Sequence, residues 1–89
     1  MRVQTFDWDD WNIEHIARHG LEPHDVETAC RGEIVVLRGR EGRHLVYGRT
    51  STGRYLLVVL SHRGSGVARV ITARDMTQQE RRFYHHRRR

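Results

Sequence analysis

The stretch from Arg69 to Tyr84 holds the residue types that bind phosphate and transfer protons. It begins as a strand-like run that ends in Arg74, and a helix is expected to open at Thr77, with Glu80 three residues later, the spacing of a capping box. A guanidinium binds phosphate through paired N–H donors, while carboxylate and tyrosine side chains exchange protons. The stretch therefore indicates chemistry on a phosphodiester, with Arg74 as the first candidate for a phosphate clamp.

Composition favours an anionic partner. The chain has 89 residues and a formal net charge of +5, and all 16 of its basic residues are arginine. A small basic domain favours nucleic acid or an acidic protein as its partner. We expect one domain spanning residues 1–89, with too little core for a deep substrate cavity, so a surface groove is the better expectation.

The single cysteine, Cys30, excludes an internal disulfide and a CxxC zinc site. This cysteine usage fits a reducing cytoplasm. The chain has no apolar run near the length of a membrane span and no core of a signal peptide, so we expect a cytoplasmic protein without a membrane partner.

Apolar periodicity predicts an α+β fold in the order (β)ααββββα. Two N-terminal helices and one C-terminal helix should pack on a four-stranded antiparallel sheet, because the turns between the strands are short and carry glycine. The segment 2–6 is either a short strand or a lead-in. We expect Trp8 and Trp11 to belong to the core. The predicted helices are 8–19, 23–31 and 78–86, and the predicted strands are 34–37, 44–49, 55–62 and 67–73.

The hairpins predict a cluster at one end of this sheet. A turn at 50–53 places Arg49 opposite Arg54 or Tyr55, and the following hairpin places Tyr55 opposite roughly Arg74. Side chains on neighbouring strand ends lie within reach of one another, although a slip of one residue would turn them to the other face. The cluster is either a phosphate-binding patch or a solvated basic edge.

Cleavage of RNA by its own 2′-hydroxyl needs a base, an acid and positive charge on the phosphorane. Glu80 is either the base or part of the capping box, and Tyr55 is a candidate proton donor, as are Tyr47 and Tyr84. His19 either packs and bonds to backbone or takes part in catalysis. His15 and His19 share a helical face, but no third ligand is evident, so we expect neither a metal nor a cofactor. Candidate RNA-binding or phosphate-clamping arginines are Arg49, Arg54, Arg63, Arg74, Arg81 and Arg82.

These motifs together resemble the BrnT family of bacterial toxins, relatives of the RelE-type ribonucleases. The resemblance is carried by Phe6-Asp-Trp-Asp9, Arg18-His-Gly-Leu21, the core strand Tyr55 to Leu60, the stretch Arg69 to Arg74, and Glu80-Arg81 with Tyr84. Arg18 stands where the family usually has lysine, and His15 where many members have asparagine. The family's histidine is retained as His19, and its pattern also points to Arg74.

The resemblance implies the toxin of a type II toxin–antitoxin system. Such a toxin cleaves RNA and halts translation, and a small DNA-binding antitoxin encoded beside it covers its active surface. A non-catalytic module that binds nucleic acid or protein through an arginine-rich sheet edge is the main alternative, and a degenerate toxin retained as a promoter-binding partner is another. The sequence leaves the RNA target and the oligomeric state open.

Overall fold

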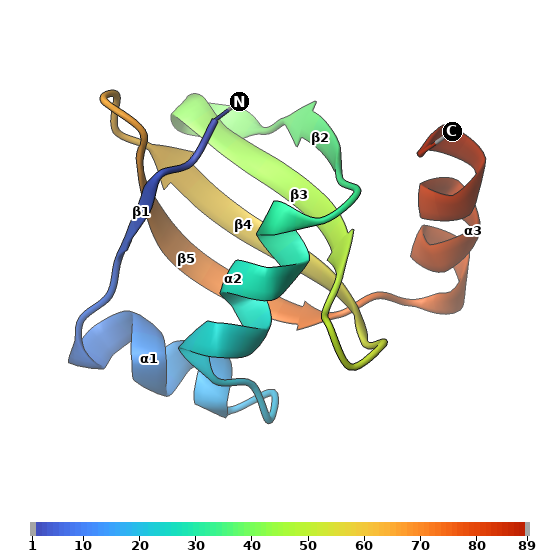
Figure 1. The fold of residues 1–89 in the computed structure, drawn as a ribbon, viewed down its shortest axis with the longest axis horizontal. Helices are drawn as coiled ribbons and strands as arrows, with labels where there is room; N and C mark the ends of the chain where they lie inside the picture. The colour runs from blue at the N-terminus through green and yellow to red at the C-terminus, as the bar shows by residue number, and fades with distance from the viewer. Residues whose placement is uncertain (1, 89) are drawn as a thin grey trace.

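The computed structural model describes residues 2–88, which form three helices and a sheet. Figure 1 shows the elements in chain order. They are β1 (Thr5–Asp7), α1 (Asp10–Ala17), α2 (Pro23–Arg31), β2 (Val35–Arg38), the 3₁₀ turn η1 (Arg40–Gly42), β3 (Arg43–Arg49), β4 (Tyr55–His62), β5 (Val67–Asp75) and α3 (Gln78–Arg87). The predicted order and type of the helices and strands are confirmed, with shifts of a few residues at their ends.

The sheet has five strands in the order β1-β5-β4-β3-β2, with β4 at its centre as predicted. The prediction of a four-stranded antiparallel sheet is wrong in one respect. Residues 5–7 form a true strand, and β1 pairs parallel with β5, from Thr5 opposite Val67 to Asp7 opposite Arg69. Hairpin turns reveal only antiparallel neighbours, so a strand whose partner lies some 60 residues along the chain leaves no such signal.

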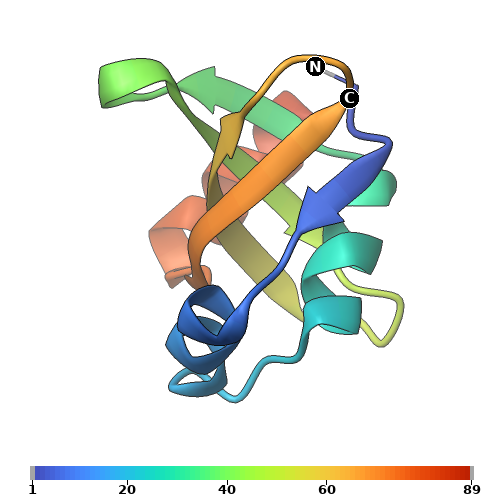
Figure 2. The same cartoon turned by 90° about the vertical axis from the view of Figure 1, so that its left-hand side faces the viewer.

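Helices cover both faces of this sheet. Figures 1 and 2 show α2 on one side and α3 on the other, with α1 below the ends of β1 and β5. The larger core joins α1 and α2 to the sheet through Ile16, Val26, Val46, Leu56 and Val70, which are fully buried. Alternate residues of β3 and β4 therefore face α3 instead, as the period-two geometry of strands requires.

The second core lies beneath α3. Its buried members are Val35, Tyr47, Leu57, Met76 and Tyr84. On the opposite face, α2 approaches β3 so closely that a Cβ on Gly48 would lie 2.3 Å from the carbonyl oxygen of Ala29. Only glycine permits this approach, because it has no Cβ.

A β-bulge interrupts the pairing of β4 with β5. Leu60 is opposite Val70, whereas Val59 is opposite Thr72, so Ile71 has no partner on β4. A bulge adds one residue to one strand and bends it. Beyond the bulge, Arg74 is opposite Leu57, so the predicted pairing of Arg74 with Tyr55 is wrong by two residues.

Helix α1 begins two residues later than predicted, at Asp10. Asp9 is the N-cap, and its carboxylate accepts a hydrogen bond from the Asn12 backbone N–H at 3.2 Å. Asn12 is fully buried and donates to the carbonyl oxygens of Asp7 and Val70. The expectation of a core role for Trp11 is wrong, because its side chain is 51% exposed. Trp8 packs beside the core and donates to Glu27 at 2.8 Å.

Across residues 2–88, the structure contains no helix that is long and apolar enough to cross a membrane.

Candidate active site

Four side chains from three elements meet at the end of the sheet that lies under α3. We call Arg49, Tyr55, Arg81 and His85 the Tyr55 cluster. The guanidinium carbons of Arg49 and Arg81 lie 5.3 Å and 4.2 Å from the centre of the Tyr55 ring. The His85 ring lies 5.1 Å from the same ring, nearly perpendicular to it. A guanidinium over an aromatic face is attracted by the ring's electrons. The Tyr55 ring is therefore in contact with two guanidinium groups and one imidazole.

Local structure explains why these four meet. Arg49 and Tyr55 are paired across the β3–β4 hairpin, as predicted. The turn between them needs Gly53, whose φ is +98° and where a Cβ would lie 3.4 Å from Arg49 Nη2. Glycine adopts this backbone at little cost. Arg81 and His85 are four residues apart in α3, so they project from one face of that helix.

An ion pair fixes the start of α3 over the sheet. Arg74 donates to both oxygens of Glu80, at 2.8 and 2.9 Å. Glu80 also accepts from the Thr77 backbone N–H at 2.8 Å, and the Thr77 hydroxyl accepts from the Glu80 N–H, which completes the predicted capping box. The hydrogen bonds that Arg74 donates to Glu80 lower the pKa of Glu80 below its ordinary value of 4.5 and raise the pKa of Arg74. Both groups are therefore charged and mutually satisfied.

The arginines of this region differ in how far they are already neutralised. Arg54 pairs with Asp75 at 2.9 Å, Arg74 with Glu80, and Arg88 with Glu33. Within residues 2–88, neither Arg49 nor Arg81 forms an ion pair, and neither guanidinium has a hydrogen bond to protein. Their charge is therefore available to an external anion.

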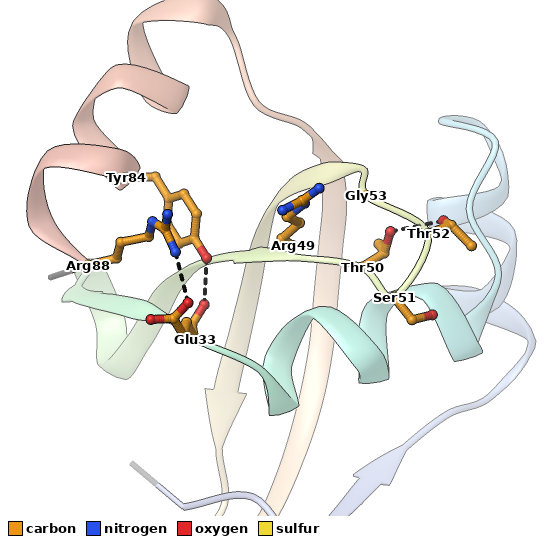
Figure 3. A pocket seen from close by; sticks show the side chains of 8 residues that line it. All are labelled: Glu33, Arg49, Thr50, Ser51, Thr52, Gly53, Tyr84 and Arg88. Atoms are coloured by element: carbon orange, nitrogen blue, oxygen red, sulfur yellow. Dashed lines mark hydrogen bonds and ion pairs between the residues drawn. The ribbon is translucent and has the colours of Figure 1, made fainter.

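The Tyr55 cluster lies in a groove made of three adjoining cavities. The first, of about 420 Å³, is lined by Arg49, Gly53 and Arg88 among others, and Figure 3 shows it. The second, of about 280 Å³, includes Tyr55 and Arg81 and shares Gly53 with the first. The third, of about 520 Å³, shares Arg81 with the second and adds Arg82 and His85. An extended polyanion would pass both unpaired guanidinium groups in this groove.

Arg54, Arg63 and His19 are predicted site residues that lie outside the Tyr55 cluster. Arg54 turns to the opposite face of the sheet, where it donates to the carbonyl oxygens of His19 and Gly20 at 3.1 and 2.8 Å and to Asp75. The Arg54 guanidinium is therefore bound away from Arg49, although Arg54 lines the second cavity together with Tyr55 and Arg81. The role of Arg54 in binding RNA stays a prediction. Arg63 follows β4 at the other end of the sheet, so the structure separates it from the cluster.

His19 is also separate. It is exposed beyond the end of α1, and its backbone carbonyl, not its imidazole, contacts Arg54. Among the residues that the structure describes, no three His, Cys, Asp or Glu side chains gather as a metal site requires. His15 instead stacks on Trp11, with ring centres 4.4 Å apart.

The tyrosines differ as proton donors. Burial raises the pKa of Tyr47 and that of Tyr84 above 10. The Tyr84 hydroxyl already donates a hydrogen bond to the backbone carbonyl of Glu33 at 2.7 Å. Within residues 2–88, neither Tyr47 nor Tyr55 has a hydrogen bond to its hydroxyl, but Tyr47 is buried in the second core, whereas Tyr55 is half-buried and lines the groove.

Sequence reasoning did not include His85 among the candidate site residues, although the predicted helix 78–86 contains it. The signal was present in the spacing of Arg81 and His85, which places both on one face of the predicted helix. Arg81 and Arg82 were included, and both line the groove. The arrangement combines an anion-binding pair of guanidinium groups with an imidazole and a phenol, the groups needed to bind a phosphodiester and to move protons beside it.

The chain matches one family model and one solved structure. The family model described as the ribonuclease toxin BrnT of type II toxin–antitoxin systems matches residues 8–80. The fold is similar to the crystal structure of the Brucella abortus ribonuclease toxin BrnT, with a TM-score of 0.69 and 24% identity. The similarity covers 85% of this chain and 100% of that one. No curated protein sequence matches the chain.

Proposed function

The chain belongs to the BrnT family of ribonuclease toxins of type II toxin–antitoxin systems, and we propose that it inhibits translation by cleaving RNA at the Tyr55 cluster until a cognate antitoxin neutralises it. The observation that supports this site is the meeting of two unpaired guanidinium groups and an imidazole around one tyrosine ring. No other part of residues 2–88 brings two arginines without an ion pair onto one aromatic ring.

The proposed reaction is transesterification within the RNA. A base removes the proton of a ribose 2′-hydroxyl, and the resulting oxygen attacks the adjacent phosphorus. The bond from phosphorus to the 5′-oxygen of the next nucleotide breaks, and an acid protonates that oxygen. The products are a 2′,3′-cyclic phosphate and a 5′-hydroxyl. Negative charge grows on the phosphorane, so fixed cations beside it contribute most to the rate.

Arg49 and Arg81 supply those cations in our proposal. They approach Tyr55 from β3 and α3, so a phosphate on the Tyr55 ring would be held from two directions. Arg74 and Glu80 then act as positioning residues, because their ion pair ties the first turn of α3 to β5. This assignment differs from the sequence-based choice of Arg74 as the clamp, since the Arg74 charge is already met by Glu80.

His85 and Tyr55 are the proposed proton-transfer groups. Histidine is the side chain that exchanges protons most readily near neutral pH, and His85 is exposed, with its ring 5.1 Å from that of Tyr55. Glu80 is a poor base here, because its carboxylate accepts three hydrogen bonds and its pKa is lowered by Arg74. The catalytic role expected for His19 stays a prediction.

The test is cleavage of a mixed-sequence RNA by the purified protein in EDTA. We expect Arg81→Ala and Arg49→Ala each to lower the cleavage rate by about 10²–10³, the usual cost of losing one stabilising group of this kind. Arg40→Ala is the matched control, because Arg40 is an exposed arginine at the opposite end of β3. Equal rates in all four proteins would place the active site elsewhere.

Translation and neutralisation need a second measurement. In a cell-free translation reaction, the protein should stop synthesis, and the product of the adjacent gene should restore it. We expect that antitoxin to present acidic side chains to the groove, because Arg49 and Arg81 have no carboxylate partners within residues 2–88. Continued synthesis at a toxin concentration that cleaves free RNA would contradict inhibition of translation by this route.

A further inference from the structure

The first cavity of the groove has polar groups that the proposed cleavage step does not use. It lies between the C-terminal half of α3 and the turn that joins β3 to β4, and we call it the Glu33 cavity. Figure 3 shows Glu33 below Tyr84 and Arg88, with the turn Thr50–Gly53 on the other side. Its volume is about 420 Å³, in the range of pockets that hold small ligands.

The Glu33 cavity adjoins the proposed cleavage site. Arg49 lines this cavity and at the same time lies over the Tyr55 ring. A phosphate held by Arg49 on Tyr55 would therefore have one of its two flanking nucleotides at the mouth of the Glu33 cavity. The groove thus contains a place for a nucleobase next to the scissile bond.

The carboxylate of Glu33 has hydrogen-bonding capacity left. Its Oε1 accepts from Arg88 Nη1 at 2.8 Å, while its Oε2 has no hydrogen-bond partner within residues 2–88. The Glu33 side chain is 68% exposed and that of Arg88 is 38% exposed. A guanidinium carries five N–H donors, and the structure assigns one of those of Arg88. An acceptor and a donor therefore lie side by side and open to the cavity.

These groups fit one base better than the others. Guanine alone presents two adjacent donors, N1–H and the N2 amino group, which a carboxylate accepts through both oxygens. Adenine and cytosine each place an acceptor nitrogen beside their amino group, and uracil flanks its one N–H with two carbonyl oxygens, so all three would set an acceptor against the carboxylate. The guanine O6, next to N1, would accept from Arg88.

We propose that the Glu33 cavity binds the base beside the scissile phosphate and selects guanine through the Glu33 carboxylate. The inference rests on the proposed function in one respect, that an RNA strand crosses the Tyr55 cluster. A well-placed bidentate contact to a base gives about tenfold or greater discrimination against the wrong base.

The test measures binding without cleavage. Single-stranded deoxy-oligonucleotides of adenosine with one central position varied among the four bases lack the 2′-hydroxyl nucleophile, and their affinities are measured by fluorescence anisotropy at fixed salt. We expect the wild-type protein to bind the guanine-containing strand about tenfold more tightly than the other three. Glu33→Gln should lose that advantage, because an amide offers one acceptor and one donor. Glu14→Gln, which neutralises an exposed carboxylate of α1, should keep it.

Two results would overturn the inference: equal wild-type affinity for the four strands, or a guanine preference that persists in Glu33→Gln. The variant should fold, because Tyr84 bonds to the backbone carbonyl of Glu33 and not to its side chain. Cleavage of the matching RNA strands is measured separately. Guanine-selective binding without RNA cleavage would remove the ribonuclease proposal for this site and leave the binding inference intact.

Discussion

Replacement of Glu80 tests how α3 is held over the sheet. Glu80→Ala removes three hydrogen bonds at once, two from Arg74 and one from the Thr77 backbone. Glu80→Gln keeps an amide oxygen that can accept a hydrogen bond from the Thr77 backbone N–H, but it removes the negative charge of the ion pair with Arg74. The two variants therefore separate the helix cap from the ion pair.

The expected magnitudes follow from these contacts. Loss of a helix-capping contact costs about 1 kcal/mol. An ion pair at the surface contributes at most about 1 kcal/mol even with good geometry, and this bidentate pair is partly exposed, with 41% of the Arg74 side chain and 22% of the Glu80 side chain accessible. Glu80→Ala should therefore cost about 2 kcal/mol and Glu80→Gln about 1 kcal/mol, which lowers Tm by about 8–16 °C and 4–8 °C in a domain of this size.

The assay is thermal unfolding by circular dichroism as a function of pH. Since Arg74 lowers the folded-state pKa of Glu80, the contribution of the charged pair is complete above the ordinary pKa of 4.5 and is lost as pH falls through the lowered value. The Tm difference between wild type and Glu80→Gln should therefore shrink below about pH 4. Glu14→Gln is the control. An unchanged Tm in Glu80→Ala at pH 7 would refute the reasoning.

Three further substitutions or reactions probe the rest of the fold. Gly48→Ala should destabilise the protein by about 1–3 kcal/mol in urea unfolding, because its Cβ would lie 2.3 Å from the Ala29 carbonyl oxygen and α2 would have to shift; a stability equal to wild type would show that the two elements separate freely. Burial raises the pKa of the Cys30 thiol to about 12, so a thiol-specific dye at pH 8 should label the native protein only as fast as it unfolds, and rapid labelling would contradict the buried position. Tyr84→Phe should cost about 1 kcal/mol, since it leaves the Glu33 carbonyl without its 2.7 Å hydrogen bond, and a urea midpoint equal to that of the wild type would indicate that water replaces the hydroxyl.

The elements of the fold were predictable because each carries a local signal. Pro23 at the first position of α2 and the capping residues Thr77 and Glu80 fix helix starts, and the glycine-bearing turns fix the hairpins. The parallel pairing of β1 carried no such signal. Trp11 follows the apolar period of α1, yet it lies outside the core because Asn12 and Ile16 occupy the buried face.

The site was predictable only as far as register could be inferred. Arg49 opposite Tyr55 followed from the hairpin and is confirmed. The pairing of Arg54 with Asp75 could not be predicted, because the two residues are 21 positions apart along the chain and only the packing of the strands brings them together. His85 was missed because its neighbour in space, Tyr55, is 30 residues away along the chain, and only the packing of α3 on the sheet brings them together.

The unpaired Ile71 decides which alternate side chains at the end of β5 face α3. If β5 kept the register of Leu60 opposite Val70, Arg74 would be opposite Leu56 and would share the face that α1 and α2 cover. The extra residue reverses that assignment for everything after it, so Arg74 faces Glu80 and Asp75 faces Arg54. A deletion of one residue from β5 before Arg74 would therefore place Arg74 on the face of Arg54 and Asp75 on the face of Glu80, so that both ion pairs would be lost.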